Sequence, residues 1–217
     1  MADDLLHLLT WLSPAFPTGG FAYSHGLEWS VEAGDVTDTI TLQSWLTDLL
    51  RNGAGRNDAI LLRHAYRADR LADIATFAAA CAPSRELAAE TLNQGTAFAA
   101  AAKPWLPPDL ATTFTAIGPI AYPVAVGALA AATGIGEEAT TIAYLHAWTA
   151  NLVSAGVRLI PLGQNAGLAV QAALEPIIRD ITALTRHASL EDISSTCIGA
   201  EIASMRHETQ YTRLFRS

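Results

Sequence analysis

Residues 137–159 read EEATTIAYLHAWTANLVSAGVRL and lie between two glycines, at 134 and 136, and Pro161. The two acidic residues at the start favour a helix, because they face the positive end of its dipole. Small residues recur three or four positions apart: Ala143, Ala147, Ala150 and Ser154. The stretch predicts one long helix whose small face fits either close packing inside a bundle or a subunit interface.

The rest of the chain repeats this helical spacing of apolar residues between short breaks rich in Gly, Pro and Ser. We expect helices over residues 3–12, 23–33, 39–52, 57–82 with a break near 69, 84–103, 109–115, 119–133, 164–174, 176–187 and 190–206. No alternation of polar and apolar residues is long enough for a strand. The chain has 217 residues and is 51% hydrophobic, which suffices for one sizeable core. The sequence therefore predicts an all-α, single-domain bundle of about ten helices over residues 1–217.

Composition excludes some classes of partner and compartment. The formal net charge of -8 has the wrong sign for a protein that holds phosphate backbones, so we expect no nucleic-acid partner. Cys81 and Cys197 show neither CxxC spacing nor the density of a disulfide scaffold, which favours a reducing compartment. The chain opens with Met-Ala-Asp-Asp where a signal peptide carries basic residues. We expect a cytoplasmic protein.

The uncharged run over residues 110–136 is long enough to span a bilayer. It contains Pro119, Pro123, Gly118, Gly127 and Gly134, however, and Ala and Thr supply most of its bulk. Membrane spans usually depend on Leu, Ile, Phe and Val, with basic residues at their flanks. We therefore interpret the run as buried helices and keep a small membrane protein as an alternative.

Motifs of common catalytic sites are missing from the sequence. It contains no GxxxxGK[ST] phosphate loop, no GxGxxG, no HExxH and no GxSxG. The six histidines are scattered along the chain instead of paired four residues apart. His25 and Glu28 would share a helix face, as in half of a di-iron motif, but the second half is missing. An all-α metal- or cofactor-dependent enzyme with a site near this pair is the alternative function.

Three segments combine polar and aromatic residues too densely for simple core packing. They are residues 13–28, SPAFPTGGFAYSHGLE; residues 158–164, RLIPLGQ; and residues 204–217, SMRHETQYTRLFRS. The first resembles the signature of the UreF family of urease accessory proteins, which runs Pro-x-Gly-x-Phe-x-[Tyr/His]-Ser-x-Gly-Leu-Glu. The other two segments resemble further motifs of this family, in the same order. The resemblance covers essentially the whole chain.

This resemblance implies a homodimeric, all-α scaffold and not an enzyme. It implies binding to the accessory protein UreD, called UreH in some species, recruitment and regulation of the GTPase UreG, and nickel delivery to the urease apoprotein. We expect no resident cofactor and only weak nickel binding by the isolated chain. The expected partner-binding residues are Phe21, Tyr23, Ser24, His25, Glu28, Gln164, Arg206, His207, Glu208, Gln210, Tyr211, Arg213, Leu214, Phe215 and Arg216.

Residues 204–217 are expected to form a flexible partner-binding tail. Tyr211, Leu214 and Phe215 have the spacing by which a short helix fills a groove, and Arg and aromatic side chains are frequent at binding hot spots. In the UreF family the corresponding tail is implied to become ordered on binding UreD. We therefore expect the tail to be poorly fixed in the free chain, so that deletion of residues 209–217 leaves the fold intact. The other interpretation is a terminal segment that covers the core.

Overall fold

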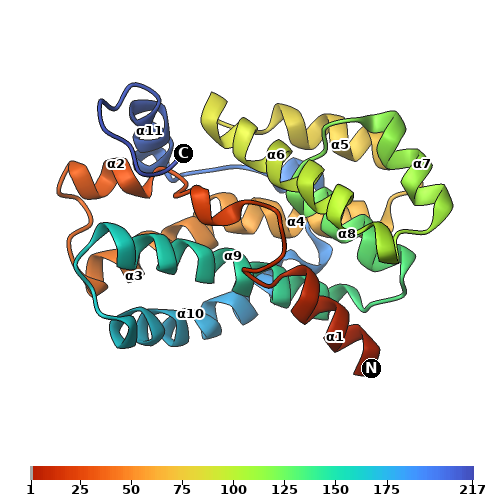
Figure 1. Ribbon diagram of the computed structural model, residues 1–217, viewed down its shortest axis with the longest axis horizontal. Helices are drawn as coiled ribbons and strands as arrows, with labels where there is room; N and C mark the ends of the chain where they lie inside the picture. The colour runs from red at the N-terminus through yellow and green to blue at the C-terminus, as the bar shows by residue number, and fades with distance from the viewer. Residues whose placement is uncertain (1) are drawn as a thin grey trace.

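Helices α4 (Ala54–Arg67) and α8 (Tyr122–Ala132) cross at the centre of the computed structural model, which describes residues 2–217 (Figure 1). Every residue of α8 from 123 to 130 is buried. At the crossing, a Cβ atom built on Gly127 would lie 2.2 Å from the carbonyl oxygen of Leu62. The two helices therefore approach so closely that only glycine fits at this position.

The other α-helices surround this pair and are joined by short turns. They are α1 (Ala2–Trp11), α2 (Leu27–Glu32), α3 (Thr39–Asn52), α5 (Leu71–Ala80), α6 (Arg85–Ala101), α7 (Pro108–Ile117), α9 (Glu137–Leu159), α10 (Gln164–Leu184) and α11 (Ile198–His207). Residues 2–217 contain no strand. The all-α, single-domain prediction is confirmed.

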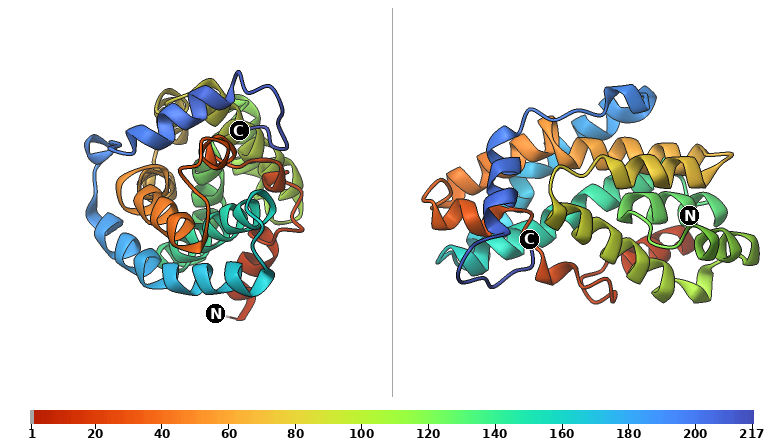
Figure 2. Two further views of the ribbon diagram at one scale, coloured as in Figure 1. Left: turned by 90° about the vertical axis from the view of Figure 1, so that its left-hand side faces the viewer. Right: turned by 90° about the horizontal axis from the view of Figure 1, so that it is seen from above.

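The helices lie in two groups on either side of α4. Helices α3, α9 and α10 pack together on one side, and α5, α6, α7 and α8 form the other (Figures 1 and 2). Helices α2 and α11 pack against each other at one end of the molecule. The two ends of the sequence reach different parts of the fold, since α1 projects at the far end from α11 (Figure 1).

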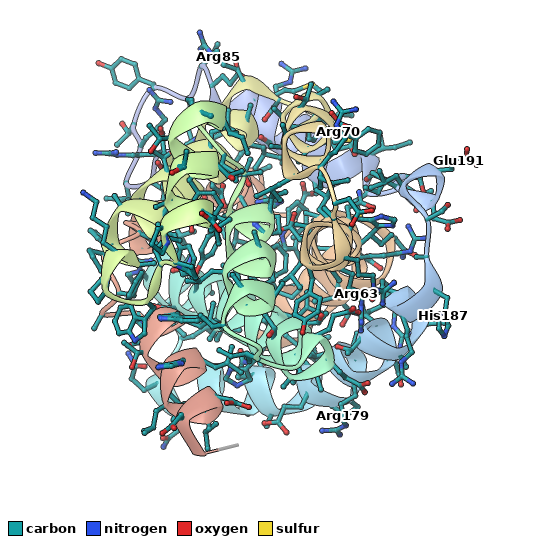
Figure 3. The ribbon with its side chains drawn as sticks, turned by 90° about the vertical axis from the view of Figure 1, so that its right-hand side faces the viewer. Arg63, Arg70, Arg85, Arg179, His187 and Glu191 are labelled. Carbon is teal, nitrogen blue, oxygen red and sulfur yellow. The ribbon has the colours of Figure 1, made fainter. Side chains whose placement is uncertain are left out.

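A buried arginine joins α4 to the first of these groups. The side chain of Arg63 on α4 is 2% exposed, and Figure 3 shows it inside the outline of the molecule, whereas Arg85 and Arg179 lie at its edge. Its guanidinium donates to the carbonyl oxygen of Thr182 at 2.7 Å and to the carboxylate of Glu137. A buried charge must be paired in this way to offset its loss of hydration. Arg63 thus fixes α4 against the start of α9 and the end of α10.

Some boundaries differ from the sequence predictions. Helix α10 continues through Pro176, because Leu174 and Ile178 on either side of the proline are buried on one face. The Ala-rich helix begins at Tyr122 and places Pro123 in its first turn, where a missing N–H costs nothing. The helix expected over residues 190–206 is interrupted: after a short 3-10 turn at Leu190–Asp192, α11 begins at Ile198.

The face of α9 with small residues lies at the edge of the core. Ala143, Ala147 and Ala150 are half-buried and Ser154 is exposed, whereas Tyr144 and Leu152 on another side of the helix are buried. This face is therefore not the one that packs into the bundle interior. Within residues 2–217, no helix is both long and apolar enough to cross a membrane.

Candidate functional site

The turn before α2 adopts a conformation that non-glycine residues seldom take. Gly26 has a φ of 81° and His25 a φ of 58°, in the left-handed region that costs an ordinary residue about 1 kcal/mol or more. A Cβ on Gly26 would lie 2.9 Å from the backbone nitrogen of Ser204, so glycine also allows α11 to approach. The strained turn is held by the far end of the sequence. The backbone N–H of His25 donates to Ser217 Oγ at 3.2 Å.

Residues 216 and 217 pair with this turn through the backbone. Arg216 N donates to the carbonyl oxygen of Ala22 at 2.8 Å, and Ser24 N donates to the main-chain oxygen of Ser217 at 3.0 Å. The hydroxyl of Ser24 donates to the same oxygen, and both serines are fully buried. Segments more than 190 residues apart in the sequence therefore form one structural unit.

Glu28 lies at the centre of a buried ion cluster. Its carboxylate accepts hydrogen bonds from the backbone nitrogens of Leu214, at 2.7 Å, and Phe215, at 2.9 Å. His207 Nε2 lies 3.0 Å from the same carboxylate, and His207 Nδ1 lies 2.6 Å from Glu86 Oε2. Arg213 donates to the other oxygen of Glu86 at 2.7 Å. The cluster connects α2, α6, α11 and residues 213–215, and its members partner one another as buried charges require.

A second carboxylate on α6 extends the cluster. Glu90 accepts a hydrogen bond from the Ser217 hydroxyl at 2.6 Å, and its other oxygen lies 3.4 Å from His25 Nδ1. Burial lowers the pKa of His25, but the nearby carboxylates of Glu90 and Asp58 outweigh this effect, so the net pKa is raised. The carboxylates thus make the protonated form of His25 easier to hold than burial alone would allow, and this form pairs with Glu90.

The last residues present one buried and two exposed hydrophobic side chains. Phe215 is 5% exposed, and the guanidinium of Arg158 lies 4.4 Å from the centre of its ring, a cation–π arrangement. Arg158 also donates to the carbonyl oxygen of Phe21 at 3.0 Å. Tyr211 is fully exposed and Leu214 is 75% exposed. The arrangement fixes the backbone of this segment while the side chains of Tyr211 and Leu214 face solvent, as on a surface that binds a protein partner.

Comparison with known proteins agrees with this architecture. Residues 36–175 match the family model UreF. The chain is 52% identical over 220 residues to a "Urease accessory protein UreF" from Bradyrhizobium sp. (strain BTAi1 / ATCC BAA-1182), an alignment covering 98% of this chain and 92% of the relative. The chain belongs to the UreF family. Proteins of the same name from Methylorubrum populi (48% identical, 99% of both chains) and Cereibacter sphaeroides (46% identical, 100% of both chains) match it over their full lengths.

The structure of this UreF-family member brings most of the expected partner-binding residues together. The cluster and its edges contain Phe21, Tyr23, Ser24, His25, Glu28, His207, Arg213, Leu214, Phe215 and Arg216. Glu208 lies nearby and accepts from Arg85 N at 3.1 Å. Arg206 is exposed, and Gln210 donates to the carbonyl oxygen of Thr212 within its own segment. Gln164 is exposed at the start of α10, and none of the side-chain hydrogen bonds described for residues 2–217 ties it to the cluster.

Two expectations from helical spacing are wrong. Helix α11 ends at His207, so Tyr211, Leu214 and Phe215 do not lie on one helix face. The reason is that Glu28 binds the backbone N–H groups of two successive residues, which helical hydrogen bonding would occupy. Helix α2 begins at Leu27, after the left-handed turn, so His25 and Glu28 share no helix face and bind different partners. The geometry therefore does not support the alternative of a metal enzyme at this pair.

Sequence reasoning did not find Glu86 and Glu90. Their spacing of four residues on an Ala-rich helix, just after the N-cap Ser84, is the one available signal. Both carboxylates are nearly buried, at 9% and 5% exposure, which sets them apart from solvent-facing acids. Within the described part of the chain, no three or more His, Cys, Asp or Glu side chains are placed to hold a metal ion.

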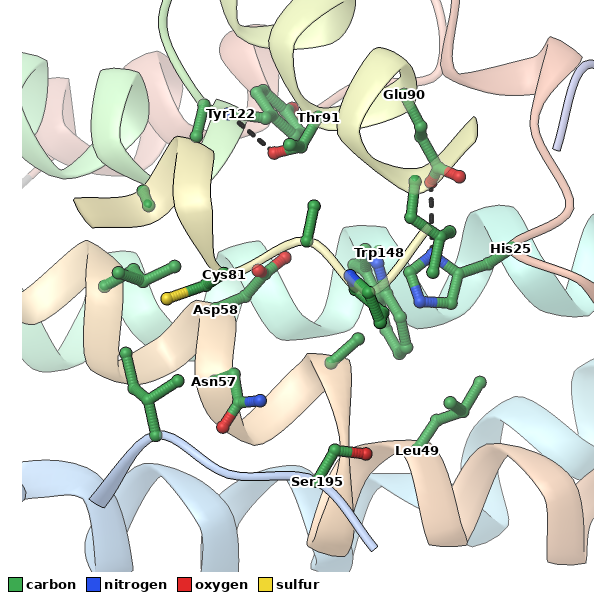
Figure 4. A pocket seen from close by; sticks show the side chains of 18 of the residues that line it. His25, Leu49, Asn57, Asp58, Cys81, Glu90, Thr91, Tyr122, Trp148 and Ser195 are labelled. Carbon is green, nitrogen blue, oxygen red and sulfur yellow. Dashed lines mark hydrogen bonds and ion pairs between the residues drawn. The ribbon is translucent and has the colours of Figure 1, made fainter. Parts of the chain in front are cut away.

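A cavity of about 400 Å³ lies beside the cluster, between α4, α6, α9 and residues 193–197 (Figure 4). His25 and Glu90 form part of its wall, together with Asp58, Tyr122 and Trp148. Burial raises the pKa of Asp58 to about 6, although the hydroxyl of Tyr144 donates to its carboxylate at 2.6 Å and opposes the shift. Asp58 is thus a carboxyl whose ionised form is costly in the folded chain.

We expect Asp58→Asn to stabilise the protein at pH 7.5 by about 2 kcal/mol. In the wild type, the pKa of Asp58 is about 6 in the folded state and lower in the unfolded state. Between these two values the folded state keeps a proton on Asp58 that the unfolded state has released. Stability therefore falls as the pH rises from about 4 to about 6, and the asparagine variant lacks this loss. Thermal unfolding at pH 4.5 and pH 7.5 measures the difference, and Asp69→Asn, at an exposed carboxylate, is the control. A variant no more stable than the wild type at pH 7.5 would contradict the assignment.

Proposed function

We propose that this chain is a scaffold in urease maturation that binds UreD (UreH) through residues 204–217 and the turn at residues 19–26. The supporting observation is that the ion cluster around Glu28 holds these two segments together and leaves Tyr211 and Leu214 exposed. Hydrophobic side chains on a fixed backbone lose little entropy on binding, so such a surface suits a stable protein complex. The relatives named above are urease accessory proteins, and this name agrees with the proposal.

In the same proposal, the complex recruits the GTPase UreG and takes part in nickel delivery to the urease apoprotein in the cytoplasm. This chain acts there as a homodimer and does not itself hydrolyse GTP. Its sequence has no glycine-rich phosphate loop, so nucleotide chemistry belongs to the partner. Nickel binding by the isolated chain remains weak in this proposal, and strong ligation requires atoms from a second subunit or a partner.

A double substitution at the two exposed side chains tests the proposed surface. We expect Tyr211→Ala with Leu214→Ala to reduce co-purification with UreD by about tenfold or more, since buried aromatic and aliphatic side chains at interfaces often contribute over 1 kcal/mol each. The melting temperature of the free chain should not change, because neither side chain is buried. Ile40→Ala, at a 76% exposed position on α3, is the matched control and should retain UreD. Undiminished UreD binding by the double variant would refute the proposed surface.

A further inference from the structure

The cavity between α4, α6 and α9 contains a carboxylate oxygen without a partner. Asp58 Oδ2 accepts the hydrogen bond from Tyr144, but no hydrogen bond to Asp58 Oδ1 occurs within residues 2–217. Asp58 lies deep enough for burial to dominate its titration, yet the side chain keeps some accessible surface. Since Asp58 is a lining residue, this accessible surface faces the cavity, as Figure 4 shows. This oxygen is therefore open to a ligand or to water that enters the cavity.

The wall of the cavity has a negative charge. Asp58, Glu90 and Glu201 line it, and no Lys or Arg does. His25 is the basic group in the wall, and its Nδ1 already faces Glu90. A cation entering the cavity would therefore meet a net negative charge, because His25 alone does not balance the three carboxylates, in a setting of lower effective dielectric than bulk water.

Aromatic rings form the part of the wall next to Asp58. The rings of Tyr122 and Tyr144 pack with their centroids 5.3 Å apart. Trp148 also lines the cavity, and its ring centroid lies 5.5 Å from that of His25. The Tyr122 hydroxyl makes no hydrogen bond to any described residue, and burial raises its pKa, so it stays a neutral donor and acceptor. Aromatic faces beside a carboxylate are the surroundings in which proteins hold organic ammonium groups.

Other parts of the wall are apolar. Leu49, Leu61, Leu87 and Ile193 form them. A ligand with a short alkyl chain would bury that chain here while its charged head reaches Asp58. The volume of about 400 Å³ lies within the range of small-molecule sites in proteins.

We propose that this cavity binds a small organic cation, a primary alkylammonium with a chain of a few carbons, whose head group donates to Asp58 and lies against Tyr122 and Tyr144. A bare metal ion fits the cavity less well, because the described residues offer no group of three or more His, Cys, Asp or Glu ligands. An alkylammonium needs a single carboxylate, an aromatic wall and an apolar surface. Tyr211 and Leu214 of the proposed UreD-binding surface do not line this cavity, whereas His25 belongs both to its wall and to the turn at residues 19–26.

Titration of the full chain with n-butylammonium tests the proposal, with n-butanol and Ni²⁺ as comparison ligands. We expect saturable butylammonium binding with a dissociation constant of about 1 mM, as suits so small a ligand, measured by calorimetry and by saturation-transfer NMR. The neutral n-butanol should bind about tenfold more weakly or not at all, because it cannot use the charge of Asp58. Ni²⁺ should not compete with butylammonium.

Matched variants separate the site from nonspecific attraction to an acidic protein. Asp58→Asn keeps an acceptor for the Tyr144 hydroxyl, so the variant should fold, yet it should lose at least about tenfold in butylammonium affinity. Tyr122→Phe keeps the ring and should weaken binding less. Asp69→Asn removes the same charge at an exposed position and should bind as the wild type does. Equal binding of butylammonium and butanol, competition by Ni²⁺, unchanged affinity in Asp58→Asn, or no saturable binding would each overturn the proposal.

Discussion

Replacing Gly127 with alanine is expected to lower the free energy of unfolding by about 3 kcal/mol and the melting temperature by about 10 °C. The added Cβ would lie 2.2 Å from the carbonyl oxygen of Leu62 and 3.0 Å from its carbonyl carbon. These atoms belong to the backbone of α4 and cannot rotate away. Helices α4 and α8 must therefore separate by about 1 Å, which weakens dispersion contacts along their whole crossing.

An opposing effect limits the loss. Alanine has a higher helix propensity than glycine, which returns about 1 kcal/mol in the interior of a helix. The steric cost is larger here, because every residue of α8 from 123 to 130 is buried and the helix has no free side toward which to move. The separation would also disturb the packing of Val126 and Ala128, the buried neighbours of the glycine.

Gly199→Ala is the matched control. Gly199 lies in α11, and a Cβ there would meet no atom within 4 Å. This variant should be as stable as the wild type or slightly more stable. Denaturant and thermal unfolding followed by circular dichroism measure both variants. A Gly127→Ala protein with the melting temperature of the wild type would show that α4 and α8 are not in such close contact.

Local signals in the sequence predict the helices, but contacts between distant residues decide several of their ends. Asp38 accepts a hydrogen bond from Thr41 N at 2.8 Å and Ser84 accepts from Leu87 N, as their N-cap positions suggest. Pro176 is typical of a helix end, but α10 continues past it because Leu174 and Ile178 on either side are buried. Burial of a helix face thus outweighs local propensity, and a single sequence does not reveal it.

The sequence predicts which segments form the candidate site, but it does not predict which residues contact one another there. Motif spacing indicates that residues 13–28 and 204–217 matter, and the structure brings Glu28 and His207 together. Glu86 and Glu90 complete the cluster from α6, and they bind His207 and Ser217, which lie more than 100 residues further along the chain. Two acidic residues on one helix normally indicate a face exposed to solvent. The burial of Glu86 and Glu90 depends on contacts with the C-terminal residues, and these contacts cannot be predicted from local sequence.

Deleting residues 209–217 is expected to destabilise the protein by about 4 kcal/mol, with a fall in melting temperature of about 10 °C or more. This prediction differs from the sequence-based expectation that the fold would tolerate the deletion, because the structure gives these residues buried hydrogen-bond partners. The truncation removes the N–H groups of Leu214 and Phe215 from Glu28, the guanidinium of Arg213 from Glu86, and the hydroxyl of Ser217 from Glu90. It also exposes the surface that Phe215 covers.

The cost arises because three carboxylates would keep their buried positions with fewer partners. Removing one partner of a buried ion pair costs about 3–5 kcal/mol, and loss of the Phe215 contact adds about 2 kcal/mol before water enters and offsets part of the total. The strained turn at His25 also loses the hydroxyl of Ser217 that holds its backbone N–H. We therefore expect residues 22–28 to become mobile, which hydrogen exchange of the amides of Ser24 and Glu28 would report.

Comparison of the truncation with point variants separates stability from partner binding. Phe215→Ala should lose about half of the stability lost by the truncated chain, since it removes the buried ring but keeps the backbone hydrogen bonds to Glu28. Tyr211→Ala with Leu214→Ala should keep the wild-type melting temperature, because both side chains are exposed. If the truncated chain has the same melting temperature as the wild type, residues 209–217 do not make the stabilising contacts that the structure shows. If the exposed pair lowers the melting temperature instead, the tail packs through Tyr211 and Leu214 and not through the cluster at Glu28.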